Sequence, residues 1–391
     1  MSETSESPWY SLAFEKRAKK RVRSYEAPAP LAPIADTHAH LTCFWSKDPA
    51  ECVARAALAG VRQLTTLWDP LGDKRSLATF QTQLAGWLDS ARALLAEVPL
   101  MPQSARWYCF RTPTDPTCEV KVPKRYHRAE DAASEADAAG AEDAADTVNA
   151  AGAEAASGAG AGEGLLVGIE SLPDHVRYLA GVHPYGAPDY TDEVHAQVLA
   201  ALDDPQCAGI GEIGLDYHFD AVDDVAPAPH DVQMACMARQ LEVAVARNLP
   251  VELHLRNADG DAAREAHADA AHVLEQVGVP QAGCVLHCFG EDRATMERFV
   301  DMGCHIAYGG AATFGRNESV REAFAATPLD RILFETDCPY MAPMPIRGLE
   351  CEPAMIAFTV DALSRDRAAR TGEDPEAIQW AAWENANKLL G

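Results

Sequence analysis

The sequence predicts a closed (β/α)8 barrel, in which eight parallel strands are each followed by a helix. Short apolar, β-rich runs predict strands near 34–40, 63–68, 177–183, 207–213, 250–255, 284–289, 303–309 and 331–336. Amphipathic stretches alternate with them near 48–60, 75–97, 192–203, 231–248, 261–277, 291–302, 317–326 and 352–370, with another near 375–389. This alternation is typical of parallel α/β folds, and eight repeats suffice to close a barrel.

The chain divides into a short leading segment and one large domain. Residues 1–33 carry a basic run from Lys16 to Arg23 and end in a proline-rich stretch, so we expect a tail and a stiff linker. The basic run is expected to form a solvated or partly helical arm, with phosphate contact as the alternative. Residues 34–391 are expected to form the barrel, for which a hydrophobic fraction of 48% supplies a sizeable core.

A long insertion, about residues 100–164, is expected between the second and third strands. From Glu130 to Glu163 it contains nine acidic residues and no basic one, set among alanine, glycine and serine. Such a composition buries little apolar surface and predicts disorder. The aromatic and basic stretch from Trp107 to His127 is predicted either to form a small flap or to pack on the barrel.

Cysteine usage and hydropathy indicate a cytoplasmic protein. The 11 cysteines include no Cys-x-x-Cys pair, and no apolar signal segment opens the chain, so we expect reduced thiols. No apolar run is long enough to span a membrane. A formal net charge of −26 disfavours a protein that coats DNA. It does not exclude a nuclease, because bound divalent cations reverse the charge locally.

Histidine and carboxylate residues gather at the predicted strand ends. In Asp36-Thr-His38-Ala-His40 the two imidazoles lie two residues apart, so on a strand they face the same way, and Asp36 is placed to support a ring nitrogen. Four more candidate ligands close or lie in other apolar runs: Glu212, His254, His287 and Asp337. The carboxyl ends of barrel strands meet at one mouth, so these residues predict a site for one or two divalent ions.

The residue types suggest how the six ligands would be divided between two ions. His38, His40 and Asp337 are expected to hold one ion, His254 and His287 the other, and Glu212 to bridge them. No lysine occurs between Arg125 and Asn387, which excludes a carbamylated lysine as the bridge on the central strands. Imidazoles suit Zn²⁺ or Mn²⁺, whereas phosphoryl chemistry favours Mg²⁺. Asp337 is also placed to accept a proton, with an N-cap role as the alternative.

Other residues near the strand ends are candidates for substrate contact. Arg256 is expected to bind a phosphate, or else to pair with a barrel-top carboxylate. His183 is expected to donate to a leaving oxygen or to orient phosphate, with a turn histidine as the alternative. Tyr217, Phe289 and Tyr340 could stack a nucleobase, or act as core lids.

Taken in order, the motifs resemble those of the TatD family of metal-dependent DNases. The resemblance runs through Asp36-Thr-His-Ala-His40, Gly181-Val-His-Pro184, Gly211-Glu-Ile-Gly-Leu-Asp-Tyr217, Leu249-Pro-Val-Glu-Leu-His254, His287-Cys-Phe289, Pro328-Leu-Asp-Arg331, Glu335-Thr-Asp-Cys-Pro-Tyr340 and Pro345-Ile-Arg-Gly348. It implies a TIM barrel, the six ligands given above and phosphodiester hydrolysis. Arg347, in the last motif, joins the expected substrate-binding residues.

Four positions depart from the usual pattern of that family. Gly290 and Glu291 stand where Ser-Gly is common, Leu255 stands where a small polar residue is common, and Gly315 stands where a lysine is frequent. Each change removes a polar contact or adds negative charge. They are consistent with weaker phosphate affinity or a smaller substrate.

Three functions are compatible with these residues. The leading hypothesis is a 3'-5' exonuclease-like deoxyribonuclease that acts on DNA ends or oligonucleotides through metal-activated water, with no obligate protein partner. The alternative is a hydrolase of a small amide, lactone or aminoacyl ester. A non-catalytic scaffold that recruits a basic partner is the third, and the intact ligand set argues against it, because crowded imidazoles and carboxylates destabilise a fold unless a metal pairs them.

Overall fold

A single parallel sheet of eight strands forms the centre of the molecule. The computed structural model describes residues 9–18, 21–98, 169–220 and 225–391. The strands lie side by side in chain order. Their bounds are Ile34–Asp36 (β3), Val61–Trp68 (β4), Val176–Ala180 (β5), Cys207–Asp216 (β6), Val251–Arg256 (β7), Cys284–Leu286 (β8), His305–Tyr308 (β9) and Ile332–Phe334 (β10). Each neighbouring pair is parallel.

Backbone hydrogen bonds between the first and last strands close the barrel. Thr37 N–H donates to the carbonyl of Phe334 at 3.1 Å, and His40 N–H donates to the carbonyl of Cys338 at 2.8 Å. Asp337 N–H donates back to the carbonyl of His38 at 2.9 Å. The predicted eight-stranded barrel is confirmed, and its closure places the His38 and Asp337 segments side by side.

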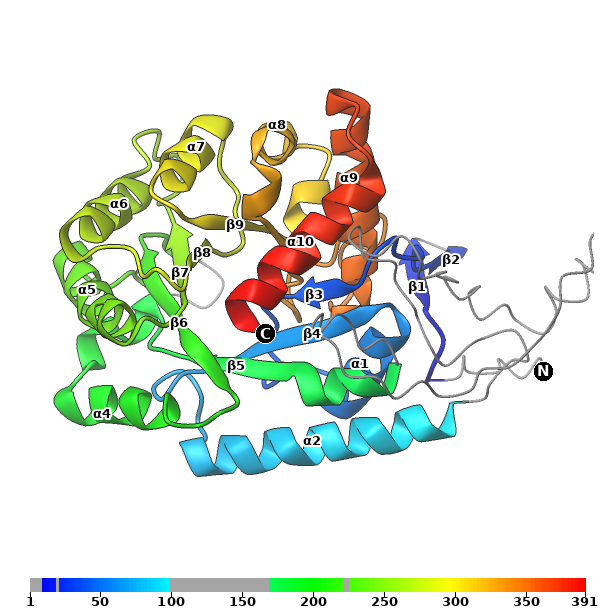
Figure 1. The fold of residues 1–391 in the computed structure, drawn as a ribbon, viewed down its shortest axis with the longest axis horizontal. Coiled ribbons are helices and arrows are strands. Elements are labelled where there is room, and N and C mark those ends of the chain that lie inside the picture. The colour runs from blue at the N-terminus through cyan, green and yellow to red at the C-terminus, as the bar shows by residue number, and fades with distance from the viewer. Residues whose placement is uncertain (1–8, 19–20, 99–168, 221–224) are drawn as a thin grey trace, which may run out of the picture. The chain divides into compact units, whose positions relative to one another are not determined.

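Helices surround the sheet on its outer side (Figure 1). Their bounds are Pro49–Leu58 (α1), Leu77–Glu97 (α2), Asp192–Ala201 (α4), His230–Arg247 (α5), Glu265–Val277 (α6), Arg293–Asp301 (α7), Glu318–Ala326 (α8), Ile356–Thr371 (α9) and Pro375–Leu390 (α10). Side-chain caps fix the first residues of several helices. The side chains of Asp48, Ser76 and Asp292 each accept a hydrogen bond from a backbone N–H in the first turn of the helix that follows. No described helix combines the length and hydropathy that crossing a bilayer requires.

The barrel interior is filled by small and branched apolar side chains. Ala35, Leu179, Val285, Ala307 and Leu333 come from five different strands and are all buried. The last turns of α10 pack Ala386, Leu389 and Leu390 against them. The interior is therefore a packed core, and the candidate metal ligands lie at the carboxyl ends of the strands.

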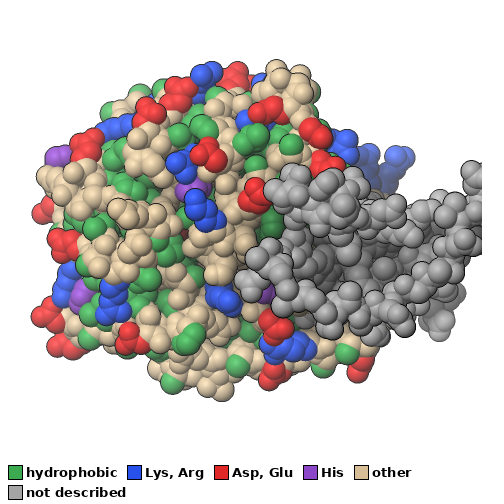
Figure 2. All heavy atoms as spheres, viewed as in Figure 1, with side chains coloured by type: hydrophobic (Ala, Val, Ile, Leu, Met, Phe, Trp, Pro, Cys, Tyr) green, Lys and Arg blue, Asp and Glu red, His purple; other side chains and the backbone are tan. Residues whose placement is uncertain are grey.

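The surface outside this core mixes charges of both signs. Figure 2 shows acidic and basic side chains interspersed over the described part of the face it presents. The nine cysteines of the described ranges form no disulfide with one another. The predicted insertion of about residues 100–164, including its aromatic stretch, lies outside the described residues.

Part of the predicted N-terminal tail is a β-hairpin. Strands Ala13–Ala18 (β1) and Arg21–Glu26 (β2) pair antiparallel. Phe14 is 4% exposed, packs edge-on against Phe358 of α9 at 5.8 Å between ring centroids, and lies under the guanidinium of Arg55. The expectation of a partly helical arm was therefore wrong for this stretch, whereas the expected solvent exposure holds for the basic residues Arg17, Arg21 and Arg23. The anchors of the hairpin lie far along the chain, where no local pattern reveals them.

Phe14→Ala is expected to lower the free energy of unfolding by about 3 kcal/mol, because a buried aromatic contact is replaced by a cavity. Val22→Ala, in the partner strand and 53% exposed, is the matched control and should change stability by less than about 0.5 kcal/mol. Urea unfolding of both variants measures the difference. Equal effects would show that the hairpin is not anchored through Phe14.

Candidate metal centre

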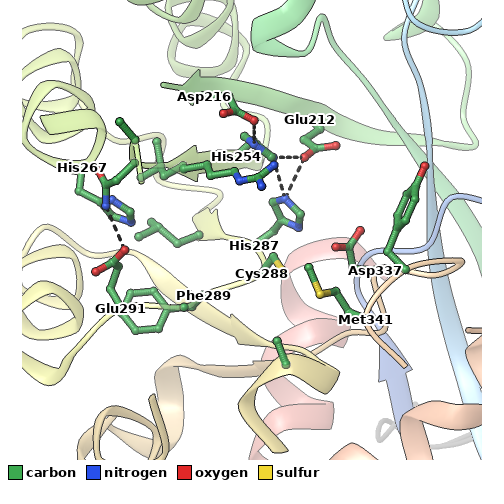
Figure 3. Close-up of a pocket in the computed structure, with 18 of the residues that line it drawn as sticks. Glu212, Asp216, His254, His267, His287, Cys288, Phe289, Glu291, Asp337 and Met341 are labelled. Atoms are coloured by element: carbon green, nitrogen blue, oxygen red, sulfur yellow. Dashed lines mark hydrogen bonds and ion pairs between the residues drawn. The ribbon is translucent and has the colours of Figure 1, made fainter. Parts of the chain in front are cut away.

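All six predicted ligands converge at the carboxyl ends of the strands. His38 and His40 follow β3, Glu212 lies in β6 and His254 in β7, while His287 follows β8 and Asp337 follows β10. Figure 3 shows the cluster formed by Glu212, His254 and His287, with Asp337 beside it. Four imidazoles and two carboxylates are thus brought together from five strands.

The first group of donor atoms is the one predicted. His38, His40 and Asp337 each place one donor atom within 4.8 Å of the other two. The Nε2 atoms of the two histidines lie 2.9 Å apart, and Asp337 Oδ1 lies 3.5 Å from His40 Nε2 and 3.7 Å from His38 Nε2. These three side chains are positioned to share one ion.

The second group differs from the predicted one. A donor atom of His38 also falls within 4.8 Å of donor atoms of Glu212 and His287, whereas His254 groups with His183 and Asp216. His38 therefore lies between the two halves of the cluster. His254 still touches the second group, because its Nδ1 lies 3.2 Å from His287 Nε2.

Glu212 faces both halves of the cluster with different oxygens. Its Oε1 lies 2.5 Å from His254 Nδ1 and 2.8 Å from His287 Nε2. Its Oε2 lies 3.8 Å from His38 Nε2 and 3.9 Å from His40 Nε2. Burial disfavours the charged form, but the facing imidazoles of His287 and His254 hold the pKa of Glu212 well below its usual range. An ionised carboxylate in this position suits a bridge between two ions.

Two carboxylates that the sequence reasoning missed orient the histidine rings. Glu252 Oε1 lies 2.7 Å from His38 Nδ1, and Asp216 Oδ2 lies 3.0 Å from His254 Nε2. A neutral ring that donates to such a carboxylate carries its proton on that nitrogen and turns the other lone pair toward the cluster. Glu252 lies two residues before His254 and Asp216 four residues after Glu212, so the period-two rule for strands could have found both.

Asp36 does not support a histidine ring, as the sequence had suggested. Its carboxylate accepts from Thr336 N–H at 2.8 Å and from Thr336 Oγ1–H at 2.7 Å. Burial raises the pKa of Asp36 to about 7. Asp36 therefore ties β3 to the residues after β10, and the ring-supporting role belongs to Glu252.

The donor set fits divalent ions. The paired ring nitrogens at 2.9 Å and 3.2 Å need a shared proton or an ion between them, because two lone pairs repel at that distance. His38 is fully buried, and Glu212 and Asp337 are each 8% exposed. Imidazole and carboxylate donors crowded in so dry a site match the ligand chemistry of Zn²⁺, Mn²⁺ or Mg²⁺.

Comparison with known proteins identifies the family of this chain. The family model described as "TatD related DNase" matches residues 115–391, which include Glu212, His254, His287 and Asp337. The chain belongs to this family. The barrel resembles the crystal structure of the TatD homologue YjjV from Escherichia coli, with a TM-score of 0.57 at 20% identity over 92% of this chain and 98% of that one.

Several relatives of this TatD-family chain carry curated names. It is 37% identical over 183 residues to the "Uncharacterized metal-dependent hydrolase YcfH" of Escherichia coli K12, covering 47% of this chain and 63% of that protein. It is 30% identical to YabD of Bacillus subtilis, another "Uncharacterized metal-dependent hydrolase", over 56% of this chain and 78% of that protein. It is 31% identical to the "3'-5' ssDNA/RNA exonuclease TatD" of Pantoea vagans, over 56% of this chain and 80% of that protein.

Glu252→Gln is expected to weaken metal binding by about tenfold or more while the protein stays folded, because the amide holds the His38 ring less firmly than the carboxylate does. Glu242→Gln, a carboxylate on α5 with no described contact to the site, is the control. Mn²⁺ titration of chelator-stripped protein measures the change. Equal affinities for the two variants would contradict the positioning role.

The ligands open into a cavity of about 960 Å³. Arg256, His183, Phe289 and Tyr340 line it, as the sequence suggested. The guanidinium of Arg256 is exposed and forms no ion pair within the described ranges, so the predicted alternative of a barrel-top salt bridge is not observed. Tyr340 is 45% exposed at the mouth, whereas Phe289 is 4% exposed and packs edge-on against Tyr308.

His183 faces the cluster as a neutral hydrogen-bond donor. Its Nδ1 accepts from Tyr185 N–H at 3.2 Å, which leaves the proton on Nε2, 3.9 Å from Glu212 Oε1. Burial, followed by the neighbouring His254, lowers the pKa of His183 to about 3. The ring is therefore uncharged at pH 7 and can orient an oxygen by donating Nε2–H.

Two predicted substrate-binding residues lie elsewhere. Tyr217 is 3% exposed, stacks on His230 at 3.4 Å and donates its hydroxyl to Asp269 at 2.8 Å, so it is a core residue. The guanidinium of Arg347 lies over the Phe314 ring at 4.2 Å from its centroid, and Arg347 does not line the cavity. Both predictions placed the residue near the carboxyl ends of the strands, as observed. Neither predicted the direction of its side chain.

Proposed function

We propose that this chain is a metal-dependent phosphodiesterase that shortens DNA or oligonucleotides from the 3' end. The observation that carries the proposal is one open cavity lined by the guanidinium of Arg256, which forms no ion pair within the described ranges, and by five of the six candidate ligands: His40, Glu212, His254, His287 and Asp337. A guanidinium binds phosphate in a bidentate manner. The Pantoea vagans relative, whose curated name is "3'-5' ssDNA/RNA exonuclease TatD", supports the same substrate class.

Each residue has a distinct role in the proposed reaction. Two divalent ions bound by this cluster would lower the pKa of a water molecule and draw electron density from the phosphoryl oxygens. Arg256 holds a non-bridging oxygen of the scissile phosphate, and the Nε2–H of His183 donates to the leaving or phosphoryl oxygen. Asp337 accepts the proton of the attacking water through its carboxylate. Burial raises the pKa of Asp337, but the hydrogen bond from His40 and the neighbouring imidazoles outweigh burial and hold that pKa below its usual range.

End-labelled oligonucleotides test this function. Chelator-stripped protein is incubated with single-stranded and duplex DNA, with Mg²⁺, Mn²⁺ or Zn²⁺ added back separately. The proposal predicts stepwise shortening from the 3' end that requires added metal. Absence of cleavage under all three ions would overturn it.

A small amide, lactone or aminoacyl ester is the second candidate substrate. Leu255 and Phe289 give one side of the cavity an apolar lining that an uncharged acyl group would fit. Metal-dependent hydrolysis of such an ester by protein that leaves DNA intact would favour this candidate. In that case Arg256→Ala should leave the rate nearly unchanged, whereas a phosphodiester substrate should lose about tenfold or more in kcat/KM.

A further inference from the structure

The basic run from Lys16 to Arg23 has no role in the proposed chemistry. It contains six basic residues and no acidic one. Its described part belongs to the hairpin of β1 and β2, at the periphery of the barrel (Figure 1). Arg17, Arg21 and Arg23 are exposed, and none of the three forms an ion pair with another described residue. In a chain with a formal net charge of −26, this local excess of positive charge indicates a surface for an anionic partner.

The register of the hairpin places like charges directly opposite each other. Lys16 in β1 pairs with Arg23 in β2, and Ala18, two residues on, pairs with Arg21. Side chains two residues apart on a strand share a face, so Lys16, Arg21 and Arg23 lie on one face of the hairpin, here called the basic face. Directly opposite side chains have Cβ atoms about 5 Å apart, and like charges at that distance destabilise the pair. An anion bound between Lys16 and Arg23 would remove this repulsion.

The basic face is turned toward the barrel. Phe14 lies on the same face, two residues before Lys16, and its ring is buried against α9. Lys16 Nζ donates to the carbonyl oxygen of Pro345 at 3.2 Å. Arg17 lies on the opposite face, because successive side chains of a strand alternate. An anion on the basic face would therefore lie beside the loop that contains Pro345.

That loop also lines the cavity of the metal centre. Tyr340 and Met341 are part of the cavity wall. Pro345 follows Met341 by four residues, so at most about 14 Å separates their backbones. With a rise of about 3.4 Å per nucleotide, a polynucleotide strand that leaves the cavity past Met341 reaches the basic face within about five nucleotides. One strand can therefore contact both sites.

An exposed aromatic ring lies beside the same loop. Trp45, which follows β3, is 66% exposed and lies edge-on to Tyr340 at 6.1 Å between ring centroids. Tyr340 is in turn edge-on to the candidate ligand His40 at 6.0 Å. The backbone N–H groups of Trp45 and Ser46 both donate to Glu350 Oε1, which holds the backbone of this segment in place. The indole thus offers a stacking surface for an unpaired base.

We propose that the basic face binds the backbone phosphates of a single-stranded polynucleotide whose 3' end lies in the metal cavity. This inference rests on the proposed phosphodiesterase function. A guanidinium binds phosphate in a bidentate manner, and only an unpaired strand leaves its bases free to stack on Trp45. Because the basic face lies several nucleotides from the cavity, it contributes to the binding of long substrates and not to the binding of a dinucleotide.

Fluorescence anisotropy of a labelled single strand of about 20 nucleotides tests this contact on chelator-stripped protein, where no cleavage is needed. Arg23→Gln is expected to raise Kd about threefold at low salt. It should also reduce the slope of log Kd against log salt concentration by about 0.7, the value for one phosphate contact on a single strand. Arg17→Gln removes the same charge from the opposite face and is the matched control, which should keep both wild-type values. Equal changes in the two variants, or no change in either, would overturn the inference.

Steady-state cleavage separates this inference from the proposed function. With metal added, Arg23→Gln should raise KM for the long strand about threefold, while kcat and the KM of a dinucleotide stay unchanged. A long-strand KM that does not change overturns the inference and leaves the phosphodiesterase intact. Binding that depends on Arg23 without cleavage under any ion supports the basic face and overturns the phosphodiesterase. If Arg23→Gln instead weakens binding to vesicles that contain phosphatidylserine and keeps its affinity for the strand, the basic face binds a membrane surface and the inference is overturned.

Trp45→Ala tests the preference for a single strand. The variant should bind the long single strand about fivefold more weakly, the low end of the effect of losing one stacked base, and should bind a blunt duplex as the wild type does. Equal losses for the two substrates would overturn the single-strand assignment.

Discussion

Asp337→Asn is expected to lower kcat by about 1000-fold and to shift Tm by less than about 2 °C. The substitution keeps the shape of the side chain but removes the negative charge that pairs with His40, 3.5 Å away, and the base that accepts the proton. Asp337 lies in the cavity wall at 8% exposure, so an amide of equal size fits without repacking. Single-turnover cleavage and differential scanning calorimetry measure the two effects.

Asp330→Asn is the control for this variant. Asp330 lies in the short 3-10 helix before β10, its side chain is 73% exposed, and it has no contact with the cluster. It should retain wild-type turnover. If Asp337→Asn were to retain it as well, the assignment of Asp337 as ligand and base would be wrong.

Gly214→Ala is expected to destabilise the fold by about 4 kcal/mol or more, enough to reduce soluble yield. Gly214 lies in β6 between Glu212 and Asp216 with φ of +145°, and an added Cβ would lie 2.1 Å from the carbonyl oxygen of His254 in β7. The neighbouring atom is backbone, so relief requires the two strands to separate at the metal cluster. Urea unfolding of the purified variant measures the loss.

Gly260→Ala separates the steric clash from backbone strain. Gly260 also has a positive φ, +74°, but its Cβ would meet no atom within 4 Å. We expect a loss of about 1–2 kcal/mol, the cost of the left-handed conformation alone. Similar losses at the two glycines would show that strand spacing at Gly214 adapts without cost.

The strands and the metal ligands were predictable from the sequence because both depend on local periodicity. Alternating apolar runs gave all eight barrel strands, and parallel strands must end at one mouth, which brings His38 and Asp337 together across about 300 positions. The same rule would have placed Glu252 and Asp216 on the cluster face. They were missed because the sequence pattern alone does not distinguish a carboxylate that supports a histidine ring from a carboxylate exposed on the surface.

Side-chain direction and long-range anchoring were not predictable in this way. Tyr217 follows the last residue of β6, yet its ring stacks on His230, and only the packing of α5 and α6 decides that it is buried. Phe14 joins its hairpin to α9 through a contact more than 300 positions away. Neither contact leaves a periodic signal, because each depends on the shape of a partner element.

Metal stoichiometry tests the central claim most directly. Chelator-stripped wild-type protein and Glu212→Gln are titrated with Mn²⁺, and bound ions per chain are counted by equilibrium dialysis. If Glu212 joins two ion sites, as its two oxygens suggest, the wild type binds two ions and the variant loses at least one at the same free concentration. A wild type that binds no ion, or a variant that binds as many ions as the wild type with equal affinity, would contradict the proposed centre.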